Sequence, residues 1–504
     1  MEEAPTMASS FPLDRLPTEL VRQVGSCLST HDALSFCRSS KSIYPLIHPL
    51  LFHHVTIRWS PYSAVVPPNI TSLLQFMLRN PSYAGYIKTL DLPRVVYRSC
   101  VAWSRDLKGG NPWHWSPEDK ALARAALEDC HLPHAERWYT AVVEEANLGA
   151  IIALVLAQCT NLRHLTVDAC FFPNINEYFT DVLRSAITPS LSQPEPPARP
   201  PLLPSLAHVT VTQDRNLIPH DDHEPPSAAP PEAFLLFFYL PRLATLHLGF
   251  ERVSFIAWNR QPWDPYKLFR WPLATPPRAA TLTSLELDNI VASGYAIEFL
   301  LQHTPGLESL VCGFSPLDMA PPLNLNDLRR GLDHVRGTLT RLAIRHDVEN
   351  VKTVDPTAKT GVVHGKLGPL TSLTSLRSLE ISPHLLLGEA EAGADPHTAP
   401  PLGPLLPAGL RSLVLNANFR RDVEWPAESV AALLNDFFSA AAWRTATPLL
   451  EDFFLCMHGA RTTATQYWYD VRVRDEFMQM VEDQGIMCTM HTYEYANYNW
   501  GDLD

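Results

Sequence analysis

The stretch Leu162-Arg163-His164-Leu165-Thr166-Val167 decides the fold class, because its apolar residues stand at the first, fourth and sixth positions. Side chains alternate along a β-strand, so the fourth and sixth residues face a core while the third and fifth point away from it. The same Leu-x-x-apolar-x-apolar pattern occurs ten times in the chain. Its opening residues are Ile87, Leu162, Leu206, Leu243, Leu282, Leu307, Leu339, Leu376, Leu410 and Leu450.

The pattern alone is weak evidence, since three apolar residues coincide by chance at roughly one position in ten. Three features strengthen it. The opening residue is leucine in nine of the ten copies, and the copies from Leu162 onward are 25 to 44 residues apart. An apolar helical stretch usually precedes the copy, as at 151–158 and 296–302. Helix, turn, strand and loop in repetition predict an α/β fold.

The repeated unit resembles the leucine-rich repeat family through its L-x-x-L-x-L core. Its spacing exceeds the ~20–29 residues typical of that family, and most copies lack the family's asparagine. The resemblance therefore implies an irregular solenoid, with a parallel sheet on the concave side and helices on the convex side. The alternative is a βα array of another α/β fold. No strand ends in a glycine-rich phosphate turn, which disfavours a nucleotide-binding sheet.

A second distinctive segment, Leu16-Pro17-Thr18-Glu19-Leu20, begins a predicted helical unit at residues 13–56. Leu20, Val24 and Leu28 recur at four-residue spacing, so they share one face of a helix. A unit of about 40 residues rarely supports a core by itself. Its apolar faces therefore need another surface to pack against.

Two more helices are predicted in this unit. Ser29 is placed to cap the second helix, with Asp32 near its positive N-terminal end. A third helical piece is expected from about Ser40 into Pro45, which should limit it.

The segment from Leu16 to Val55 resembles an F-box. The match consists of the L-P-x-E-L opening, Val24 and Leu28, the Asp32-x-Leu34-x-Phe36 block and the Leu50-Leu51-Phe52 ending. The family usually has Cys and then Trp in the third helix, where this chain has Ser40 and Ile43 beside Tyr44.

The resemblance implies that the unit docks on the Skp adaptor of an SCF (Skp–cullin–F-box) ubiquitin ligase, and through it on a cullin. The adaptor-binding residues that it implies are Leu16, Pro17, Leu20, Val24, Leu28, Leu34 and Phe36. The remainder of such a chain captures the protein substrate. The alternative is a helix pair that packs on the body of the protein as a cap.

Composition limits the possible partners. The net charge of −13 disfavours a general nucleic-acid binder, and no apolar run is long enough to predict a membrane span. The N-terminus does not resemble a signal peptide. Nine cysteines without a C-x-x-C motif indicate reduced thiols in the cytoplasm or nucleus. Cys27, Cys37, Cys159 and Cys312 are expected to be core residues.

The predicted domains follow these patterns. A disordered segment covers 1–12, the F-box-like unit 13–56, and the solenoid 57–466. Insertions are expected at about 95–147, 189–204, 219–232 and 388–407. The first of them holds a predicted helix from Pro117 to about Cys130, capped by Ser116. The aromatic-rich segment 467–504 is expected to cap the last repeat and to end in an acidic tail.

The useful surface is the sheet face that carries the third and fifth residues of each copy. The positions that follow add Asp168, Asp288 and Arg345, and the face also includes Glu380. Its mixed charges suit a protein partner. The candidate substrate-binding residues are His164, His208, His247, Glu286, Asp288, Arg341 and Arg345.

No catalytic residue, metal site or cofactor is predicted, because the chain has no P-loop, G-x-S-x-G or H-E-x-x-H motif. The acidic and histidine-rich run at 220–224 lies in a proline-rich loop without a rigid frame. The sequence predicts a non-catalytic, substrate-recruiting ligase subunit. The alternatives are a leucine-rich-repeat scaffold outside any ligase and an enzyme within the tryptophan-rich insertion or the aromatic tail.

Overall fold

The protein is an α/β protein built around a 12-stranded parallel sheet. The computed structural model describes the residues that follow. They are 16–58, 68–93, 115–171, 177–192, 202–212, 231–249, 271–290, 292–314, 323–346, 363–388, 400–418, 425, 427–439, 442–458, 468 and 470–493.

The strands follow one another in the sheet in the order of the sequence, β1-β2-β3-β4-β5-β6-β7-β9-β11-β12-β13-β14. Their bounds are β1 His54–Thr56, β2 Thr89–Leu92, β3 His164–Asp168, β4 His208–Thr212, β5 Thr245–Gly249, β6 Ser284–Ile290, β7 Ser309–Phe314, β9 Arg341–His346, β11 Ser378–Ile381, β12 Ser412–Asn418, β13 Asp452–His458 and β14 Met487–Tyr493. A parallel pair of two residues each, β8 (Leu323–Asn324) and β10 (Val363–His364), forms a second sheet.

Each of the ten predicted copies contains one strand of the large sheet, so the predicted α/β class is confirmed. The copies align in register: Leu285 pairs with Leu310, and Leu310 with Leu342. These leucines are fully buried. Consecutive repeats therefore bury one continuous apolar ladder beneath the sheet.

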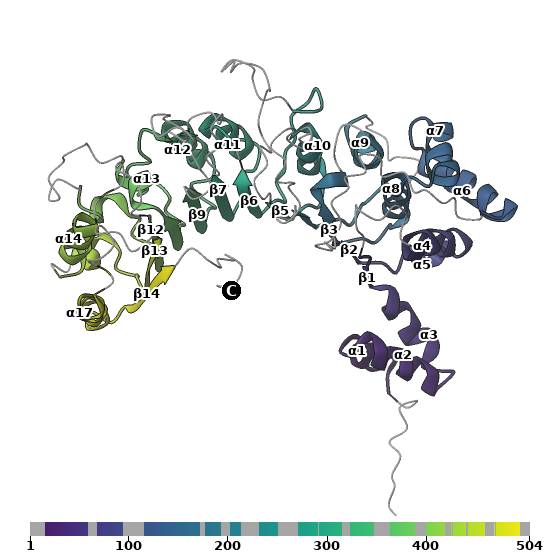
Figure 1. The fold of residues 1–504 in the computed structure, drawn as a ribbon, viewed down its shortest axis with the longest axis horizontal. Coiled ribbons are helices and arrows are strands. Elements are labelled where there is room, and N and C mark those ends of the chain that lie inside the picture. The colour runs from purple at the N-terminus through teal and green to yellow at the C-terminus, as the bar shows by residue number, and fades with distance from the viewer. Residues whose placement is uncertain are drawn as a thin grey trace, which may run out of the picture. The chain divides into compact units, whose positions relative to one another are not determined.

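Helices occupy most of the segments between the strands, but among the described residues none lies between β5 and β6 or between β9 and β11. Figure 1 shows α11 and α12 on one side of strands β7 and β9. The helices of eight or more residues are α1 Thr18–Ser26, α2 Thr30–Ser39, α4 Pro68–Arg79, α6 Pro117–Cys130, α8 Leu148–Gln158, α9 Glu177–Ser192, α11 Gly294–Leu301, α12 Leu325–His334, α14 Ala427–Ser439 and α17 Val471–Glu482. Shorter helices are α3 Tyr44–Ile47, α5 Pro81–Ala84, α7 Ala135–Tyr139, α10 Pro231–Leu235, α13 Pro383–Leu387 and α15 Ala442–Ala446. Among the described residues, no helix combines the length and apolar character needed to cross a membrane.

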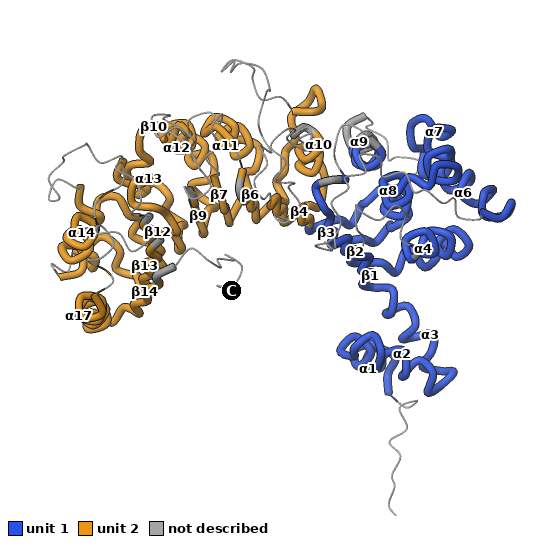
Figure 2. Tube along the Cα trace, viewed as in Figure 1, with its two compact units in different colours: residues 1–171, 176–208 blue, residues 172–175, 209–504 orange. Residues whose placement is uncertain are grey.

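The chain divides into two compact units (Figure 2). Unit 1 comprises residues 1–171 and 176–208, and unit 2 comprises 172–175 and 209–504.

Helices α1, α2 and α3 begin unit 1 and form a small core of their own. Val21, Ala33, Cys37, Ile43 and Ile47 are buried in it. The predicted cap of α2 is confirmed, because the hydroxyl of Ser29 accepts a hydrogen bond from the backbone N–H of Asp32 at 3.2 Å.

The third helix differs from the prediction. Pro45 lies in the first turn of α3 rather than at its end, and a 3₁₀ turn, η2 (His48–Phe52), continues from it. Proline is tolerated in a first helical turn because the backbone N–H that it lacks has no intrahelical partner there.

Aromatic contacts join these helices to the start of the sheet. The ring of Phe52 stacks on Phe76 of α4, with centroids 5.6 Å apart, and meets Tyr83 of α5 edge-on at 4.9 Å. Strand β1 follows at once and pairs with β2. The C-terminal end of the N-terminal helical segment is thus attached to α4, α5 and the first strands of the sheet.

Parts of the predicted insertions belong to regular structure. Helix α6 and its cap at Ser116 are confirmed. Helix α9 extends to Ser192, into the predicted insertion at 189–204. The insertion at 388–407 ends in a packed 3₁₀ turn, η8 (Gly403–Leu405), flanked by buried Leu402 and Leu406. The leucine side chains explain this packing. The surrounding prolines and glycines had led to the prediction of a loop there. Residues 1–12 and most of 219–232 lie outside the described residues.

The C-terminal segment adds a further helix and strand, α17 and β14, where a cap was expected. Trp468 is buried and meets Phe477 of α17 edge-on, with ring centroids 5.5 Å apart. Residues 470–493 thus extend the repeat pattern by one unit, and 494–504 lie outside the described residues.

Candidate functional site

The strands of unit 2 place polar side chains in aligned rows on the face opposite the buried leucines. His247 of β5 pairs with Glu286 of β6, and Gly249 pairs with Asp288. Because alternate residues of a strand share a face, Glu286 and Asp288 both project on the side of His247.

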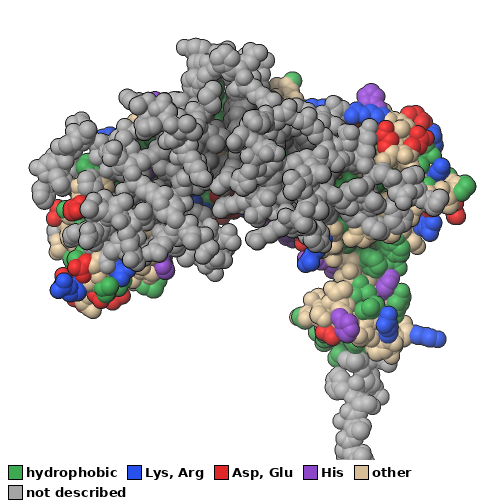
Figure 3. All heavy atoms as spheres, viewed as in Figure 1, with side chains coloured by type: hydrophobic (Ala, Val, Ile, Leu, Met, Phe, Trp, Pro, Cys, Tyr) green, Lys and Arg blue, Asp and Glu red, His purple; other side chains and the backbone are tan. Residues whose placement is uncertain are grey.

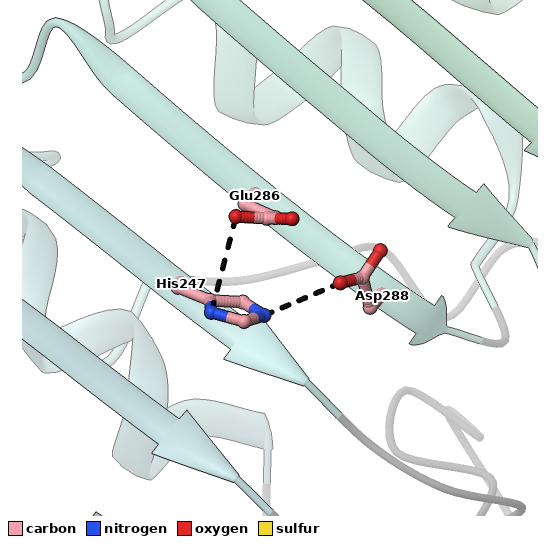
Figure 4. A group of neighbouring side chains, drawn as sticks. All are labelled: His247, Glu286 and Asp288. Carbon is pink, nitrogen blue, oxygen red and sulfur yellow. Dashed lines mark hydrogen bonds and ion pairs between the residues drawn. The ribbon is translucent and has the colours of Figure 1, made fainter. Parts of the chain in front are cut away.

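These three side chains form one cluster (Figure 4). The imidazole Nε2 of His247 lies 3.2 Å from Oδ2 of Asp288, and Nδ1 lies 3.8 Å from Oε2 of Glu286. All three side chains are half-buried. A single imidazole therefore contacts two carboxylates from the neighbouring strand.

Arg345 of β9 extends the cluster across the sheet. Its guanidinium Nε and Nη2 donate to Oε1 and Oε2 of Glu380 at 2.7 and 3.0 Å, and Nη1 lies 4.0 Å from Oδ1 of Asp288. Strand β7 lies between β6 and β9 and carries Gly313 opposite Arg345. A glycine there leaves room for the long side chain to reach across.

The environment sets the charges of the cluster. Burial opposes a charge on His247, but the hydrogen bond with Asp288 and the adjacent carboxylates raise its pKa. Burial raises the pKa of Glu286. Burial also acts to raise the pKa of Asp288, but the hydrogen bond and positive charge of His247 outweigh it and lower that pKa. These directions favour a protonated His247 beside an ionised Asp288.

The other candidate substrate residues lie apart from this cluster. His164 and His208 stack in unit 1, with ring centroids 4.3 Å apart and planes within 7°. Burial and the neighbouring His164 lower the pKa of His208. Arg341 is exposed at the start of β9. Asp168 was expected on the same face but is buried.

The sequence-based selection missed two members of the cluster. Glu380 belongs to the predicted face but not to the candidate substrate-binding residues, and Asn416 belongs to neither. The amide Nδ2 of Asn416 donates to Oε1 of Glu380 at 2.9 Å. A signal was present, because Asn416 stands six residues after Leu410, the same interval that separates Asp288 from Leu282 and Arg345 from Leu339.

A second candidate site lies on the N-terminal helices, where large apolar side chains are exposed. Leu20 is 45% exposed, Val24 43%, Leu34 39% and Tyr44 47%. Figure 3 shows hydrophobic side chains on the surface of the N-terminal helices, at the lower right. Exposed apolar side chains grouped in this way mark interaction surfaces.

The seven predicted adaptor-binding residues divide into two groups. Pro17, Leu20, Val24 and Leu34 are exposed. Leu16, Leu28 and Phe36 are half-buried and pack against the small helical core. The first group is thus open to a partner, while the second group supports the helices.

Three of the four cysteines that were expected in the core are buried there. Cys37, Cys159 and Cys312 are buried as expected, but Cys27 is exposed at the end of α1. Burial raises the pKa of Cys159 to about 12, so its thiol stays protonated at neutral pH. Cys27 differs because it follows the last residue of the helix and turns away from the core.

Comparison with known proteins identifies no relative: no family model and no curated protein matches the chain. Geometry and chemistry therefore carry the functional argument.

Proposed function

We propose that this chain is a non-catalytic, substrate-recruiting subunit of an SCF-type ubiquitin ligase. The N-terminal helices act as an F-box that binds the Skp adaptor, and through it a cullin. The repeats form an irregular leucine-rich-repeat solenoid that holds a protein substrate. Catalysis then depends on proximity to the ubiquitin-charged enzyme rather than on residues of this chain.

The exposure of Leu20 and Val24 carries the adaptor half of the proposal. These residues share one face of α1, whereas Val21 and Gly25 of the same helix are buried. Helices that only capped the repeats would bury the Leu20 face. Its exposure favours an external partner over the scaffold alternative.

The third helix supports the same surface despite its departures from the F-box pattern. Ile43 is buried in the small core, whereas the adjacent Tyr44 is exposed and stacks on His48 with ring centroids 4.5 Å apart. An aromatic side chain is thus available one position after the family's usual tryptophan. Aromatic residues commonly anchor protein interfaces.

Adaptor binding by the full-length chain tests the proposal. We expect the purified chain to co-elute with a Skp adaptor at micromolar concentration, and Leu20→Asp with Val24→Asp to abolish co-elution. Leu28→Asp is unsuitable because Leu28 packs against the core and its substitution would unfold the helices. Circular dichroism should show that the double variant keeps the wild-type fold.

A matched control introduces the same charges elsewhere on the helices. Gln23→Asp with Ser35→Asp changes exposed residues of α1 and α2 and should leave co-elution unchanged. Failure of the wild-type chain to bind the adaptor contradicts the ligase proposal. Equal loss of binding in the control pair would show that the apolar face is not the determinant.

A further inference from the structure

We propose that His247, Glu286 and Asp288 form a binding site for a divalent transition-metal ion of the zinc type. The site lies wholly within unit 2 and is independent of the proposed adaptor surface. Its three side chains project from adjacent strands of the sheet, which fixes their backbone positions. Metal sites require ligands on such rigid elements.

The distances suit a small cation. One ligand atom from each residue can be chosen so that all three lie within 4.8 Å of one another. Zinc bonds nitrogen and oxygen at about 2.0–2.2 Å, so its donor atoms lie about 3–4 Å apart. The His247–Asp288 separation of 3.2 Å already meets this requirement. The Glu286 carboxylate lies 3.8 Å from the other ring nitrogen, Nδ1, so the proposed site requires it to turn toward Nε2 and join His247 and Asp288 around one ion.

Charge favours an added cation. The cluster holds three carboxylates, those of Glu286, Asp288 and Glu380, and one guanidinium, that of Arg345. Binding of the ion displaces the proton that His247 otherwise carries, and two negative charges then remain in the cluster. Partly buried charges are costly without compensation, and a divalent ion supplies the missing positive charge.

Neighbouring side chains orient the ligands. Arg345 approaches Oδ1 of Asp288, which leaves Oδ2 for the ion, and the same guanidinium is held by both oxygens of Glu380. Asn416 in turn holds Glu380. Such outer partners fix ligand orientation and strengthen metal binding in proteins.

The ligand set indicates the class of metal. An imidazole nitrogen with two carboxylates suits zinc and similar transition ions, whereas magnesium and calcium prefer all-oxygen sites. Three protein ligands leave a further coordination position open. We expect water or an acidic side chain of a bound protein to fill that position.

Calorimetric titration of the full-length chain with Zn²⁺ tests the site. The wild type should bind one more equivalent of Zn²⁺ than the Glu286→Gln/Asp288→Asn double variant, which also subtracts any binding by thiols. The single variant Asp288→Asn should weaken that equivalent at least about tenfold. Circular dichroism spectra establish that each variant is folded.

Two control variants remove the same kinds of group elsewhere. Glu451→Gln changes an exposed carboxylate that pairs with Arg411 at 3.0 Å, and His164→Gln changes the stacked histidine of unit 1. Both should bind Zn²⁺ as the wild type does. Equal Zn²⁺ binding by the wild type and both site variants overturns the site. Mg²⁺ binding as tight as Zn²⁺ binding overturns the assigned metal class.

Discussion

Arg345 links the acidic side chains on the polar face of unit 2. Its side chain is largely buried, and so is that of Glu380, to which it donates two hydrogen bonds. Removal of one partner from such a pair leaves the other charge without compensation. Arg345 thus stabilises the fold mainly by compensating the negative charge of the largely buried Glu380 carboxylate.

Replacing Arg345 by methionine should lower the free energy of unfolding by about 2–3 kcal/mol, measured by urea denaturation in metal-free buffer. Adding Glu380→Gln to this variant should recover about 1 kcal/mol, because the glutamine keeps the acceptor for Asn416 without the charge. Arg341→Met on the same strand is the control, and its effect should stay within about 0.5 kcal/mol. A larger loss in the double variant than in Arg345→Met would contradict this account.

Asp119, in the first turn of α6, is a second buried carboxylate whose charge is compensated by an arginine. It is 1% exposed, accepts two hydrogen bonds of 2.7 Å from Arg79, and bonds the capping Ser116. The Arg79 hydrogen bonds, followed by the smaller contribution of Ser116, lower its pKa despite burial. A carboxyl whose pKa is lower in the folded state adds stability above its unfolded pKa, about 3.9 for aspartate. That stability is lost as the pH falls through the folded value.

Asp119→Asn should therefore destabilise the protein at pH 7 and have a progressively smaller effect as the pH falls below about 4. The difference between the urea midpoints of wild type and variant, followed from pH 7 to pH 3, measures this. Glu118→Gln, an exposed change in the same helical turn, should alter the midpoint only slightly. A pH-independent difference for Asp119→Asn would refute the role of its charge.

Among the elements, strands were predictable where the apolar triplet opened with leucine or isoleucine. The pattern does not predict strands β1 and β14, because the residue at the first position of the triplet is neither leucine nor isoleucine there. β1 follows Phe52, within a segment attributed to the helical unit, and β14 follows Gly485, which has a φ of +82°. Their register still obeys the pattern, since Val55 pairs with Leu90 and Phe453 with Cys488.

The candidate cluster could be predicted only in part. Alternation along the strands placed His247, Glu286, Asp288 and Arg345 on one face, as the structure has them. Their meeting depends on which strands are neighbours and on the absence of a side chain at Gly313, features that spacing within one copy does not encode. The partnership of Glu380 with Arg345 and Asn416 was invisible for the same reason.

Close contact between helices α11 and α12 depends on glycine. A Cβ added at Gly294 would lie 2.0 Å from the carbonyl oxygen of Asn324, and one at Gly331 would lie 2.8 Å from the Cα of Glu298. Backbone atoms cannot yield as a side chain can. These two glycines therefore set the distance between the helices.

Gly294→Ala should lower the free energy of unfolding by about 1–3 kcal/mol, although alanine is the better helix former. Gly337→Ala is the matched control, because no atom lies within 4 Å of the added methyl group. The control should change stability by less than about 1 kcal/mol. Thermal melts of the two variants measure the difference, and equal melting temperatures would contradict the packing argument.

At the scale of the whole molecule, the two proposed sites belong to different units. The apolar face of α1 and α2 lies in unit 1, and the His247 cluster lies in unit 2. Each strand of the sheet bonds only to its immediate neighbours. In such repeat architectures stability and structural change are transmitted mainly between adjacent units. Metal binding in unit 2 should therefore affect adaptor binding in unit 1 very little.

This arrangement predicts that adaptor binding and metal binding are thermodynamically independent. The Glu286→Gln/Asp288→Asn variant should bind the Skp adaptor with an affinity within about twofold of wild type, and Leu20→Asp with Val24→Asp should keep the wild-type Zn²⁺ affinity. Coupling between two bound ligands is reciprocal, so saturating Zn²⁺ and saturating adaptor must change each other's affinity for the wild-type chain by the same factor. A change of about fivefold or more in both would show that the units act as one allosteric body. That result would mean that metal binding and adaptor binding change each other's affinity, whereas independence means that neither affects the other.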